Sequence, residues 1–586
     1  MTAPPPLLGV TRSLTGRVWT GPTPAQDRAA QALAQRSGLA DPIARVLARL
    51  GVPAEQVDDH LAPTLRALLP DPRGLRDAEA AAERLNAAVA RGQRIAIFAD
   101  YDVDGGASAA LLTVWLRAQG RDARLYVPDR IDEGYGPNPA AMAALADAHD
   151  LIVCVDCGTV AHEALAAAAA ADVVVLDHHQ GGEVLPPALA VVNPNRQDED
   201  GALGHLCAAG VVFLVLVEAN RQLRAAGRAG PDLMGLLDLV ALATVADVAP
   251  LVGVNRAFVR QGLAVMARRE RPGLVALADV AGLDRPPDPY HLGFVLGPRV
   301  NAGGRVGRAD LGARLLSCAD AAEAARLATE LDRLNVERRA IEAAARAEAR
   351  AQAEARLEAA SAPALAWAAG EGWHPGVVGI VAARLKEATG LPAVVLALEG
   401  GIATGSARSV AGVDIGAAVA RLVAEGLALR GGGHAMAAGL SVAAGSLAPA
   451  MARLEELLAR QGAGRDGPAA LPLDGVLMPG AATPDLVAAL DAAGPFGAAA
   501  PAPRFAFPAL AVRDARPVGA DHLKLRLFDD TGARIEAIAF NVAASPLGAA
   551  LRDHSGHRLH VAGTLEINHW QGRRTVQLRL SDAART

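Results

Sequence analysis

The sequence predicts an α/β protein in which a parallel-sheet domain is joined by a long helix to a smaller α/β domain, with a small antiparallel β-barrel at the C-terminal end. Three observations support this prediction. Short apolar strands alternate with helical segments over residues 95–180 and end in polar loops, which is typical of a parallel sheet. Residues 320–360 contain neither Gly nor Pro, as expected for one long exposed helix. After about residue 470, strands that alternate apolar and basic residues are separated by turns, which favours a small barrel.

Length and composition set broad limits on this architecture. A chain of 586 residues is long enough for several domains. We expect a helical extension, a parallel-sheet domain, a connecting helix, a second α/β domain and a barrel, at residues 1–70, 71–319, 320–360, 361–462 and 470–586. The sequence shows no apolar stretch of membrane-spanning length, no signal pattern and only four Cys, so we expect a cytoplasmic protein with no membrane partner. The net charge of −6 excludes indiscriminate coating of nucleic acid but allows a local basic groove.

An acidic loop follows the first strand of the predicted sheet. The apolar residues 95–98 lead into Asp100, Asp102 and Asp104, which at a spacing of two in an extended segment would lean to one side. Like charges at this distance raise each other's pKa and destabilise the fold, so we predict a divalent cation among them. An EF-hand loop would need a Glu where Leu111 stands and a helix before it, so this alternative is disfavoured. A solvated acidic turn is the other alternative.

Two more predicted strands, 151–155 and 173–176, also end in potential metal ligands. The ligands are Asp156 after the first of these strands, and Asp177, His178 and His179 after the second. Because the carboxyl ends of parallel strands share one edge of a sheet, we expect these groups to converge on one site. A scatter of solvated charges would not show this regularity.

The apolar helix of the segment LVALATVADVAPL adds Asp247 to the candidates. A carboxylate at the end of a buried helix is costly unless it is paired or binds a metal. A helix C-cap or an arginine partner is the alternative interpretation for this residue. With the other acidic segments of the same domain in mind, we favour metal ligation.

The segments DYDVDG, VDCG, DHH and ADVAPL, in this order and spacing, resemble the four motifs of the DHH phosphoesterase superfamily. The match continues as GPRVNAGGR, WHPGVVGIVAARL, GSARS and GGGHAMAAG, the last segments being similar to the DHHA1 domain. Over roughly residues 70–580 the complete set resembles the RecJ family of bacterial single-strand-specific 5′→3′ exonucleases. The resemblance implies a DHH domain, a DHHA1 domain and a C-terminal OB-fold.

The resemblance also implies metal-dependent hydrolysis of single-stranded DNA to 5′ mononucleotides in DNA repair, recombination and mismatch repair. Oxygen ligands combined with imidazoles point to Mn²⁺ or Mg²⁺, and two ions are implied, with Asp156 as the bridging carboxylate. The expected metal ligands are Asp100, Asp102, Asp104, Asp156, His178 and Asp247. The expected catalytic groups are Asp102, Asp104, Asp156, His178, His179 and Asp247, with Arg299 and Arg305 as the two candidates for stabilising charge on the scissile phosphate.

Further residues are expected to bind the DNA strand. The candidates in the first domain are Arg130, His179, Arg299, Asn301 and Arg305, and those in the DHHA1 segment are Ser406, Arg408, Gly432, Gly433 and His434. Consecutive glycines expose backbone N–H groups to an anion, although a tight turn would explain them as well. On the barrel the candidates are Lys524, Arg526, Trp570, Arg573 and Arg574, for which a solvated strand face is the alternative.

Two rival functions remain open at the level of the sequence. A phosphoesterase acting on short oligoribonucleotides, nucleoside phosphates or cyclic dinucleotides would share the motifs, but such proteins are usually shorter and lack the barrel. A non-catalytic DNA-binding scaffold would have lost metal ligands that are all present here. The resemblance further implies the single-strand-binding protein and a RecQ-type helicase as partners, and we expect a monomer.

Overall fold

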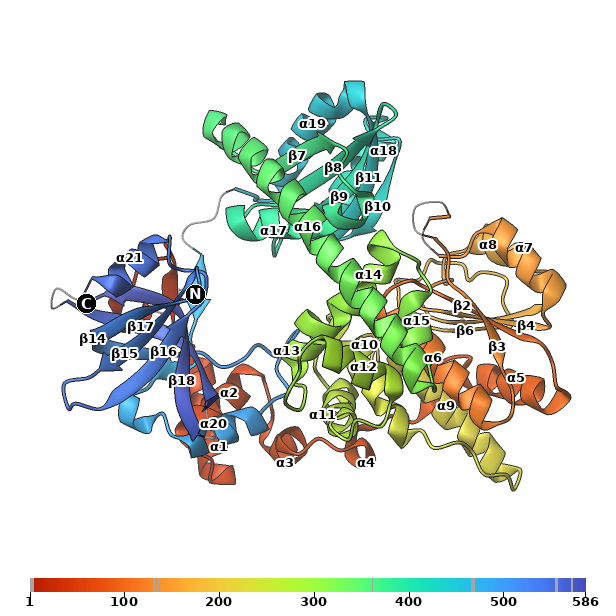
Figure 1. Cartoon of the computed structure of the whole chain (residues 1–586), viewed down its shortest axis with the longest axis horizontal. Coiled ribbons are helices and arrows are strands. Elements are labelled where there is room, and N and C mark those ends of the chain that lie inside the picture. The colour runs from red at the N-terminus through yellow and green to blue at the C-terminus, as the bar shows by residue number, and fades with distance from the viewer. Residues whose placement is uncertain are drawn as a thin grey trace. The chain divides into compact units, whose positions relative to one another are not determined.

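The computed structural model describes residues 5–129, 133–134, 136–360, 362–464, 469–553, 557–570 and 573–586. The chain forms two compact units (Figure 1). The first unit combines Met1–Leu69, Pro250–Arg260 and Gly467–Thr586, and the second combines Pro70–Ala249 and Gln261–Asp466. Each unit is therefore assembled from segments that are far apart in the sequence. Among the described residues, no helix is both long and apolar enough to cross a membrane.

A parallel five-stranded sheet forms the centre of the second unit, as the sequence predicts. Its strands, in spatial order, are β3 (Ala123–Tyr126), β2 (Ile95–Ala99), β4 (Leu151–Val155), β5 (Asp172–Leu176) and β6 (Ala190–Val192). Helices α7 (Pro139–Ala148) and α8 (His162–Ala166) pack on one face of this sheet. Helices α5 (Ala78–Arg91), α6 (Val103–Ala118) and α9 (Ala208–Ala225) lie against the other face. Four of these strands, β2, β4, β5 and β6, are buried throughout their length or nearly so, which explains their continuous apolar sequences.

Helices complete this half of the second unit and connect it to the next sheet. They are α10 (Leu237–Ala246), α12 (Pro272–Val280), α13 (Pro289–His291), a π-helical turn η5 (Leu292–Leu296), α14 (Gly297–Val306), α15 (Leu311–Leu316) and α16 (Ala321–Ala359). Helix α11 (Val254–Met266) begins in the first unit and ends in the second. The 39-residue helix α16 packs on α12, α14 and α15 near its start and on α17 and β7 near its end. It is the long helix expected from residues 320–360.

The second sheet of this unit has the order β10-β11-β9-β8-β7, with only β7 and β8 parallel. Its strands are β7 (Ala366–Glu371), β8 (Ala393–Glu399), β9 (Ile402–Arg408), β10 (Arg430–His434) and β11 (Ala437–Ala443). Helix α17 (Pro375–Thr389) and the end of α16 cover one face. Helices α18 (Ile415–Ala424) and α19 (Leu447–Arg460) cover the other.

The first unit is a closed barrel with helices from the N-terminal segment packed against it. Strand order is β13-β14-β15-β16-β18-β17, and pairing of β14 with β17 closes the barrel, while the pairing of β16 with β18 is parallel. The strands are β13 (Gly475–Val476), β14 (Phe505–Val518), β15 (His522–Phe528), β16 (Arg534–Ala539), β17 (Arg558–Trp570) and β18 (Arg573–Arg585). Its helices are α1 (Pro24–Ser37), α2 (Asp41–Arg49), α3 (Val57–Leu61), α4 (Leu65–Leu68), α20 (Pro484–Ala492) and α21 (Pro546–Arg552).

The N-terminal segment is part of this barrel unit rather than a separate appendage. Strand β1 (Val18–Thr20) pairs in parallel with β12 (Ala470–Pro472). The side chain of Trp19 is fully buried and its Nε1 donates a hydrogen bond to Asp582 Oδ2 at 2.9 Å. Apolar residues of α1 and α2 belong to the same core cluster as those of the barrel strands. Both ends of the chain therefore build one core.

Candidate metal centre and nucleic-acid site

Three neighbouring strands of the parallel sheet end in aspartates, as the sequence predicts. Asp100, Asp156 and Asp177 follow β2, β4 and β5, and all three are buried. Their N–H groups continue the ladders, donating to Val155 O at 3.3 Å, Leu176 O at 3.0 Å and Val192 O at 3.1 Å, respectively. The sheet therefore fixes the backbone beneath each carboxylate, and the three groups meet at one edge.

The acidic loop is folded differently from the extended segment that we expected. Helix α6 begins at Val103, so Asp104 lies in its first turn, and Asp102 is the N-cap, whose Oδ1 accepts hydrogen bonds from the N–H groups of Asp104 and Gly105 at 2.8 and 3.2 Å. The prediction of three carboxylates along one extended strand was therefore wrong for Asp104. The tight loop requires glycine at position 105, because a Cβ there would lie 2.4 Å from Asp100 O.

Asp104 is held by the start of another helix. Its two carboxylate oxygens accept hydrogen bonds from Ala208 N at 2.6 Å and Ala209 N at 2.8 Å, at the N-terminus of α9. The N–H groups at a helix start carry partial positive charge, which suits an ionised carboxylate. This partnership connects residues about a hundred positions apart, so no local pattern could have predicted it.

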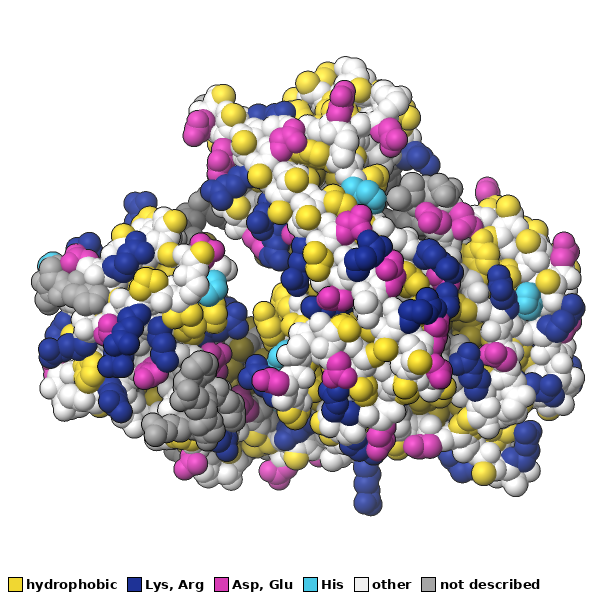
Figure 2. Space-filling view, viewed as in Figure 1, with side chains coloured by type: hydrophobic (Ala, Val, Ile, Leu, Met, Phe, Trp, Pro, Cys, Tyr) yellow, Lys and Arg dark blue, Asp and Glu magenta, His cyan; other side chains and the backbone are white. Residues whose placement is uncertain are grey.

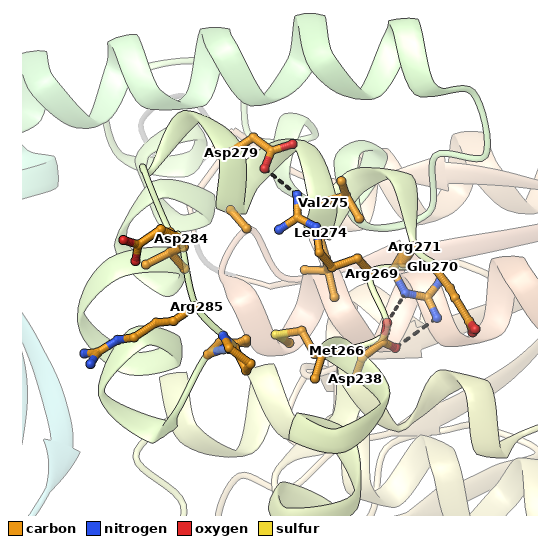
Figure 3. Close-up of a pocket in the computed structure, with 15 residues that line it drawn as sticks. Asp238, Met266, Arg269, Glu270, Arg271, Leu274, Val275, Asp279, Asp284 and Arg285 are labelled. Atoms are coloured by element: carbon orange, nitrogen blue, oxygen red, sulfur yellow. Dashed lines mark hydrogen bonds and ion pairs between the residues drawn. The ribbon is translucent and has the colours of Figure 1, made fainter. Parts of the chain in front are cut away.

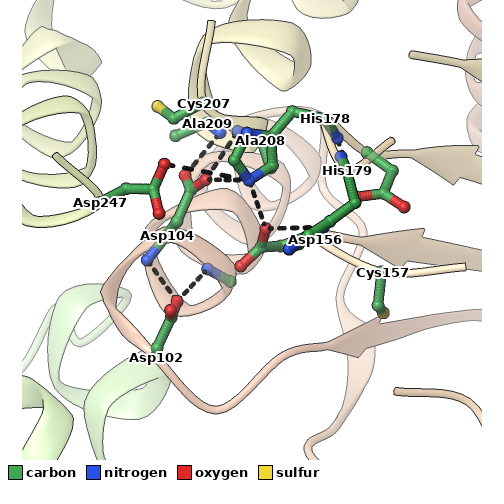
Figure 4. Close-up of polar contacts among 12 residues, drawn as sticks. Asp102, Asp104, Asp156, Cys157, His178, His179, Cys207, Ala208, Ala209 and Asp247 are labelled. Atoms are coloured by element: carbon green, nitrogen blue, oxygen red, sulfur yellow. Dashed lines mark hydrogen bonds and ion pairs between the residues drawn. The ribbon is translucent and has the colours of Figure 1, made fainter. Parts of the chain in front are cut away.

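The imidazole of His178 lies between carboxylates from three other elements (Figure 4). Its Nε2 is 3.3 Å from Asp156 Oδ1, 3.7 Å from Asp104 Oδ2 and 3.9 Å from Asp247 Oδ2. Potential ligand atoms within 4.8 Å of one another form three groups: Asp156 with His178 and His179, Asp104 with His178 and Asp247, and Asp100 with Asp102 and Asp156. The structure thus brings together all six expected metal ligands.

Burial and mutual repulsion strongly perturb these carboxyl groups. Burial, followed by the charges of Asp104 and Asp102, raises the pKa of Asp247 to about 8. Burial is also the main cause that raises the pKa of Asp104 and that of Asp156, and neighbouring aspartates add to the effect on Asp156. Hard carboxylate oxygens with one or two imidazoles are the donors preferred by Mn²⁺ and Mg²⁺, and a divalent cation would offset the repulsion. This donor set therefore fits the ions predicted from the sequence.

His179 is oriented by Asp177 rather than by the other carboxylates. Its Nδ1 lies 2.8 Å from Asp177 Oδ1, and although burial lowers the pKa of His179, this hydrogen bond and the charge of Asp177 raise it overall to about 9. Asp177 also accepts hydrogen bonds from the N–H groups of His178 and Thr159. Asp177 belongs to none of the three ligand groups, so the structure assigns it the orientation of the two histidines.

Two asparagines that we did not single out from the sequence fix the backbone of the histidine pair. Asn193 Nδ2 donates to His179 O at 2.8 Å, and Asn195 Nδ2 donates to His178 O at 2.5 Å. Both follow β6, the strand next to β5. A polar Asn-Pro-Asn segment directly after an apolar strand is the signal that could have identified them.

The two arginines of the GPRVNAGGR segment differ in their surroundings. Arg299 donates to Asp332 Oδ1 at 2.8 Å and to Val295 O at 2.7 Å, and thereby ties α14 to α16. Arg305 lines a cavity of about 360 Å³ together with Asn301, and its Nη1 donates to Gly376 O at 3.1 Å. Asn301 Oδ1 in turn accepts a hydrogen bond from Val103 N at 2.9 Å, next to the acidic loop. Arg305 and Asn301 therefore lie closer to an open surface beside the metal centre than Arg299 does.

The candidates of the second sheet lie on neighbouring strands. Ser406 and Arg408 are half-buried on β9, with Arg408 Nη1 donating to Ser406 Oγ at 2.9 Å. Gly432, Gly433 and His434 are exposed on β10. His434 and Arg408 both stand opposite Ala437 of the intervening strand β11, so their side chains leave the same face of the sheet, two strand spacings or about 10 Å apart. These residues thus form one polar surface patch on this sheet.

On the barrel, Lys524 and Arg526 project from alternate positions of β15. Lys524 Nζ is 3.1 Å from Glu536 Oε2, and Arg526 Nε is 4.0 Å from Asp514 Oδ2. Arg574 is exposed on β18, and several other Lys and Arg side chains are visible on the barrel in Figure 2. Arg130 and the side chains of Trp570 and Arg573 lie outside the described part of the chain.

An exposed aromatic residue on the barrel was missed by sequence reasoning. Phe540 is 41% exposed, with the ring of His522 at 5.1 Å and the guanidinium of Arg579 at 5.3 Å from its centroid. It follows β16 in sequence, and nothing in the local pattern distinguishes it from a core residue. Its surroundings provide an aromatic face next to basic groups, the combination that binds single-stranded nucleic acid.

A second cavity, of about 320 Å³, lies beside α11 and α12 (Figure 3). Arg271 Nε donates to Asp238 Oδ2 at 2.7 Å, and Arg269 donates to Asp279 Oδ1. Two of the three arginines that line the cavity, Arg269 and Arg271, are thus paired with carboxylates, and none of the six expected metal ligands lines it. This cavity therefore does not take part in the candidate site.

Comparisons with known proteins agree with this geometry. Residues 94–244 match the N-terminal domain of the DHH family, residues 361–460 match the DHHA1 domain and residues 473–582 match the RecJ OB domain. The parallel sheet, the acidic strand ends and these matches define a DHH-family protein.

Similar proteins are found over nearly the whole chain. The chain is 38% identical to the single-stranded-DNA-specific exonuclease RecJ of Dickeya dadantii, with 91% of this chain and 94% of that protein covered, and 36% identical to that of Escherichia coli, with 91% and 94% covered. The crystal structure of RecJ from Thermus thermophilus in complex with Mn²⁺ matches with a TM-score of 0.77 and 31% identity, covering 96% of this chain and 79% of that one. The chain belongs to the RecJ family.

Proposed function

We propose that this protein is a single-stranded-DNA-specific exonuclease that uses Mn²⁺ or Mg²⁺. The observation that carries this proposal is the convergence of carboxylates and imidazoles from four distant segments at one edge of the parallel sheet. Relatives that share nearly the whole chain are named as exonucleases of this specificity, and solved RecJ structures contain Mn²⁺ or Mg²⁺. The small-substrate alternative is not favoured, because the match extends through the barrel.

The roles of single residues follow from their contacts. Two of the three ligand groups share no residue, so two ions would fit: one group is Asp104, His178 and Asp247, and the other is Asp100, Asp102 and Asp156. Asp156 Oδ1 lies 3.3 Å from His178 Nε2 of the other group, so we assign Asp156 as the bridging carboxylate. Bound divalent cations supply Lewis-acid activation of water and of the scissile phosphodiester. His179, kept protonated by Asp177, would donate a hydrogen bond to the phosphate, and Arg305 from the adjacent cavity would balance its charge.

We further propose 5′→3′ polarity with release of 5′ mononucleotides. Ser406, Arg408 and His434, with the exposed glycines Gly432 and Gly433 beside them, would hold a terminal phosphate, since they combine a hydroxyl, a guanidinium and an imidazole on one sheet face. The barrel residues Lys524, Arg526 and Arg574 would contact phosphates further along the strand. Roles in repair, recombination and mismatch repair, recruitment by a single-strand-binding protein or a RecQ-type helicase, a monomeric state and a cytoplasmic location are proposed on family membership.

Digestion of single strands labelled at the 5′ or the 3′ end, in Mn²⁺, Mg²⁺ or chelator, tests the activity and its polarity. We expect a labelled mononucleotide at once from the 5′-labelled strand, and no product in chelator or with Asp156→Ala. Arg408→Ala should reduce digestion of a 5′-phosphorylated strand more than that of a 5′-hydroxyl strand. Equal digestion from both ends would contradict the polarity, and faster hydrolysis of a dinucleotide than of a long strand would favour the small-substrate phosphoesterase.

A further inference from the structure

Two aromatic side chains are stacked on the surface of the second unit. The rings of Tyr290 and Phe294 lie 5.2 Å apart with an interplanar angle of 24°, and the two residues are 52% and 63% exposed. Only 3% of the residues in this chain are aromatic, and several of the Phe and Trp side chains are fully buried in the core. An exposed and already paired aromatic surface of this kind is typical of a binding site.

The local backbone explains why these rings face solvent. Phe294 lies within the π-helical turn η5, where Leu292 and Leu296 are fully buried beneath it. His291, next to Tyr290, is buried, and its N–H donates to Asp288 Oδ1 at 3.0 Å. The extra residue of a π-helical turn changes the direction of the side chains that follow, and such turns are frequent at functional sites. The aromatic pair is therefore held on a rigid base.

The cavity beside Phe294 is basic and lies next to the acidic loop of the metal centre. Phe294 lines the cavity of about 360 Å³ described above, together with Asn301 and the arginines Arg305, Arg338, Arg339 and Arg384. The only carboxylate among its lining residues, Glu342, accepts a hydrogen bond from Arg338 at 2.7 Å. Asn301 separates the cavity from the acidic loop, since its amide oxygen binds Val103 N between Asp102 and Asp104. An aromatic face, a basic cavity and the metal ligands thus follow one another.

We propose that Tyr290 and Phe294 form a stacking platform for unpaired nucleobases of the strand whose phosphates contact the arginines of this cavity. This inference rests on the proposed function and names the part of the substrate that the site recognises. Every base presents a flat face, so stacking tolerates any sequence, whereas in a duplex these faces are covered by neighbouring bases. The platform therefore contributes to selectivity for single strands without reading a base edge.

Binding of an oligothymidylate of about 20 nucleotides, compared with an abasic strand of the same length, tests the platform. Affinities are measured by fluorescence anisotropy with the full chain in chelator, so that no strand is degraded. Phe294→Leu keeps an apolar side chain but removes the ring, and we expect it to weaken binding of the oligothymidylate by about 5- to 100-fold. Affinity for the abasic strand should not change with this substitution, and the salt dependence of binding should keep its slope because the phosphate contacts remain.

Two further variants keep the test decisive. Phe294→Trp should restore binding, because it restores an aromatic face. Met234→Ala, at a residue that is 50% exposed elsewhere in the same unit, controls for removal of any exposed apolar side chain and should bind both strands like the natural chain.

Three results would overturn the platform. They are unchanged affinity in Phe294→Leu, an equal loss of affinity for the two strands, and a loss that Phe294→Trp does not restore. A protein partner, rather than DNA, would then be the occupant to seek for this pair. If the natural chain digests single strands but shows one of these results, only the platform fails. If it digests no strand with either metal ion, the proposed function fails.

Discussion

Asp104, Asp156 and Asp247 surround the imidazole of His178, and burial raises the pKa of each of these three carboxyl groups. The metal-free fold therefore holds acids that would ionise easily in water. Crowding of these carboxyl groups lowers the free energy of unfolding of the metal-free protein. A bound divalent cation offsets this loss, because its charge neutralises their repulsion. Each carboxylate of the cluster should thus affect stability in opposite directions with and without metal.

Replacement of Asp247 by Asn should stabilise the metal-free protein. An unfolded chain loses the proton of Asp247 above its ordinary pKa of 3.8, whereas the folded chain keeps it up to about 8, so stability falls as pH rises between these values. Asp247→Asn removes this loss, and we expect a gain in the free energy of unfolding of about 1–3 kcal/mol at pH 8 and less at pH 5. Urea unfolding in chelator measures the gain, and added Mn²⁺ should raise the melting temperature of the natural chain only.

Asp177→Asn is the matched control for this experiment. Although burial raises the pKa of Asp177, the hydrogen bond from His179 and those from Thr159 outweigh it and hold the pKa below its ordinary value. Loss of this charge should lower the free energy of unfolding at pH 7, the opposite sign to Asp247→Asn. A gain for both variants would show that neutralising any carboxylate stabilises the fold, which would contradict the specific role of the cluster.

His60 in the barrel unit should make stability depend on pH in mild acid. Burial and the charge of Arg256 lower its pKa from 6.5 to about 4. The unfolded chain therefore takes up a proton first as pH falls through 6.5, so stability present above that value is lost between 6.5 and about 4. Because His60 is partly exposed, we expect a loss of only about 1–2 kcal/mol. Hydrogen exchange of α3 peptides measures it, and His60→Gln should abolish most of this dependence.

The convergence of the candidate metal ligands could be predicted from the sequence, whereas the contacts that support these residues could not. Asp100, Asp156 and the histidine pair follow apolar strands, and the rule that parallel strands end at one edge places them together. The contacts of Asp104 with the start of α9 and of Asn193 with the histidine backbone join segments that only the folded chain brings together. Exposure is similarly invisible in the sequence, so Phe294 and Phe540 could not be separated from core residues.

At the level of elements, the sequence predicts strands and long helices well but misjudges the acidic loop. The two sheets and α16 follow from apolar periodicity and from the absence of Gly and Pro. Helix α6 includes Asp104, which we expected in an extended segment, because Asp102 caps the helix and Gly105 permits a close approach. Residues 5–69 carry no catalytic motif, yet they complete the barrel through β1 and the helices that follow. The expected domain boundaries remain predictions.

Trp19→Phe should weaken the barrel unit. The substitution keeps most of the buried ring but removes the hydrogen bond from Nε1 to the buried Asp582. A buried carboxylate that loses a donor costs about 1–3 kcal/mol, which hydrogen exchange of β1 and β18 peptides should detect. Trp373→Phe is the matched control, because it removes the bond from Trp373 Nε1 to Glu348 in the other unit and should leave barrel peptides unaffected. Equal exchange of β18 in Trp19→Phe and in the natural chain would contradict this role.

For the whole molecule, the important feature is that the backbone passes repeatedly from one unit to the other. One crossing comes directly after Asp247. Val248, with a φ of 60°, follows this ligand, and Leu251 is already buried in the barrel unit, where its N–H donates to Ala498 O at 2.9 Å. A positive φ is unfavourable for a β-branched residue, so this short strap is held in a strained conformation. Leu251 therefore anchors the far end of the strained strap that begins after Asp247.

We expect Leu251→Ala to raise the Mn²⁺ concentration needed for half-maximal digestion by about tenfold, because Leu251 is the buried residue at the end of the short strap that follows Asp247. Affinity for a long single strand in chelator should not change. Leu490→Ala removes an equally buried side chain of the same unit outside the strap and controls for general destabilisation. If both variants need the same amount of Mn²⁺, the anchor has no specific role, and rescue of the metal requirement by Leu251→Met would support it.

The pairing of β1 with β12 also matters while the protein is being made. The ribosome releases residues 18–20 long before residues 470–472 exist, so the first strand waits for its partner during most of translation. Throughout this time the apolar residues of α1 and α2 lack the barrel strands that cover them in the finished chain. Nascent chains that stop short of the last strands should therefore be the species that aggregate or engage chaperones.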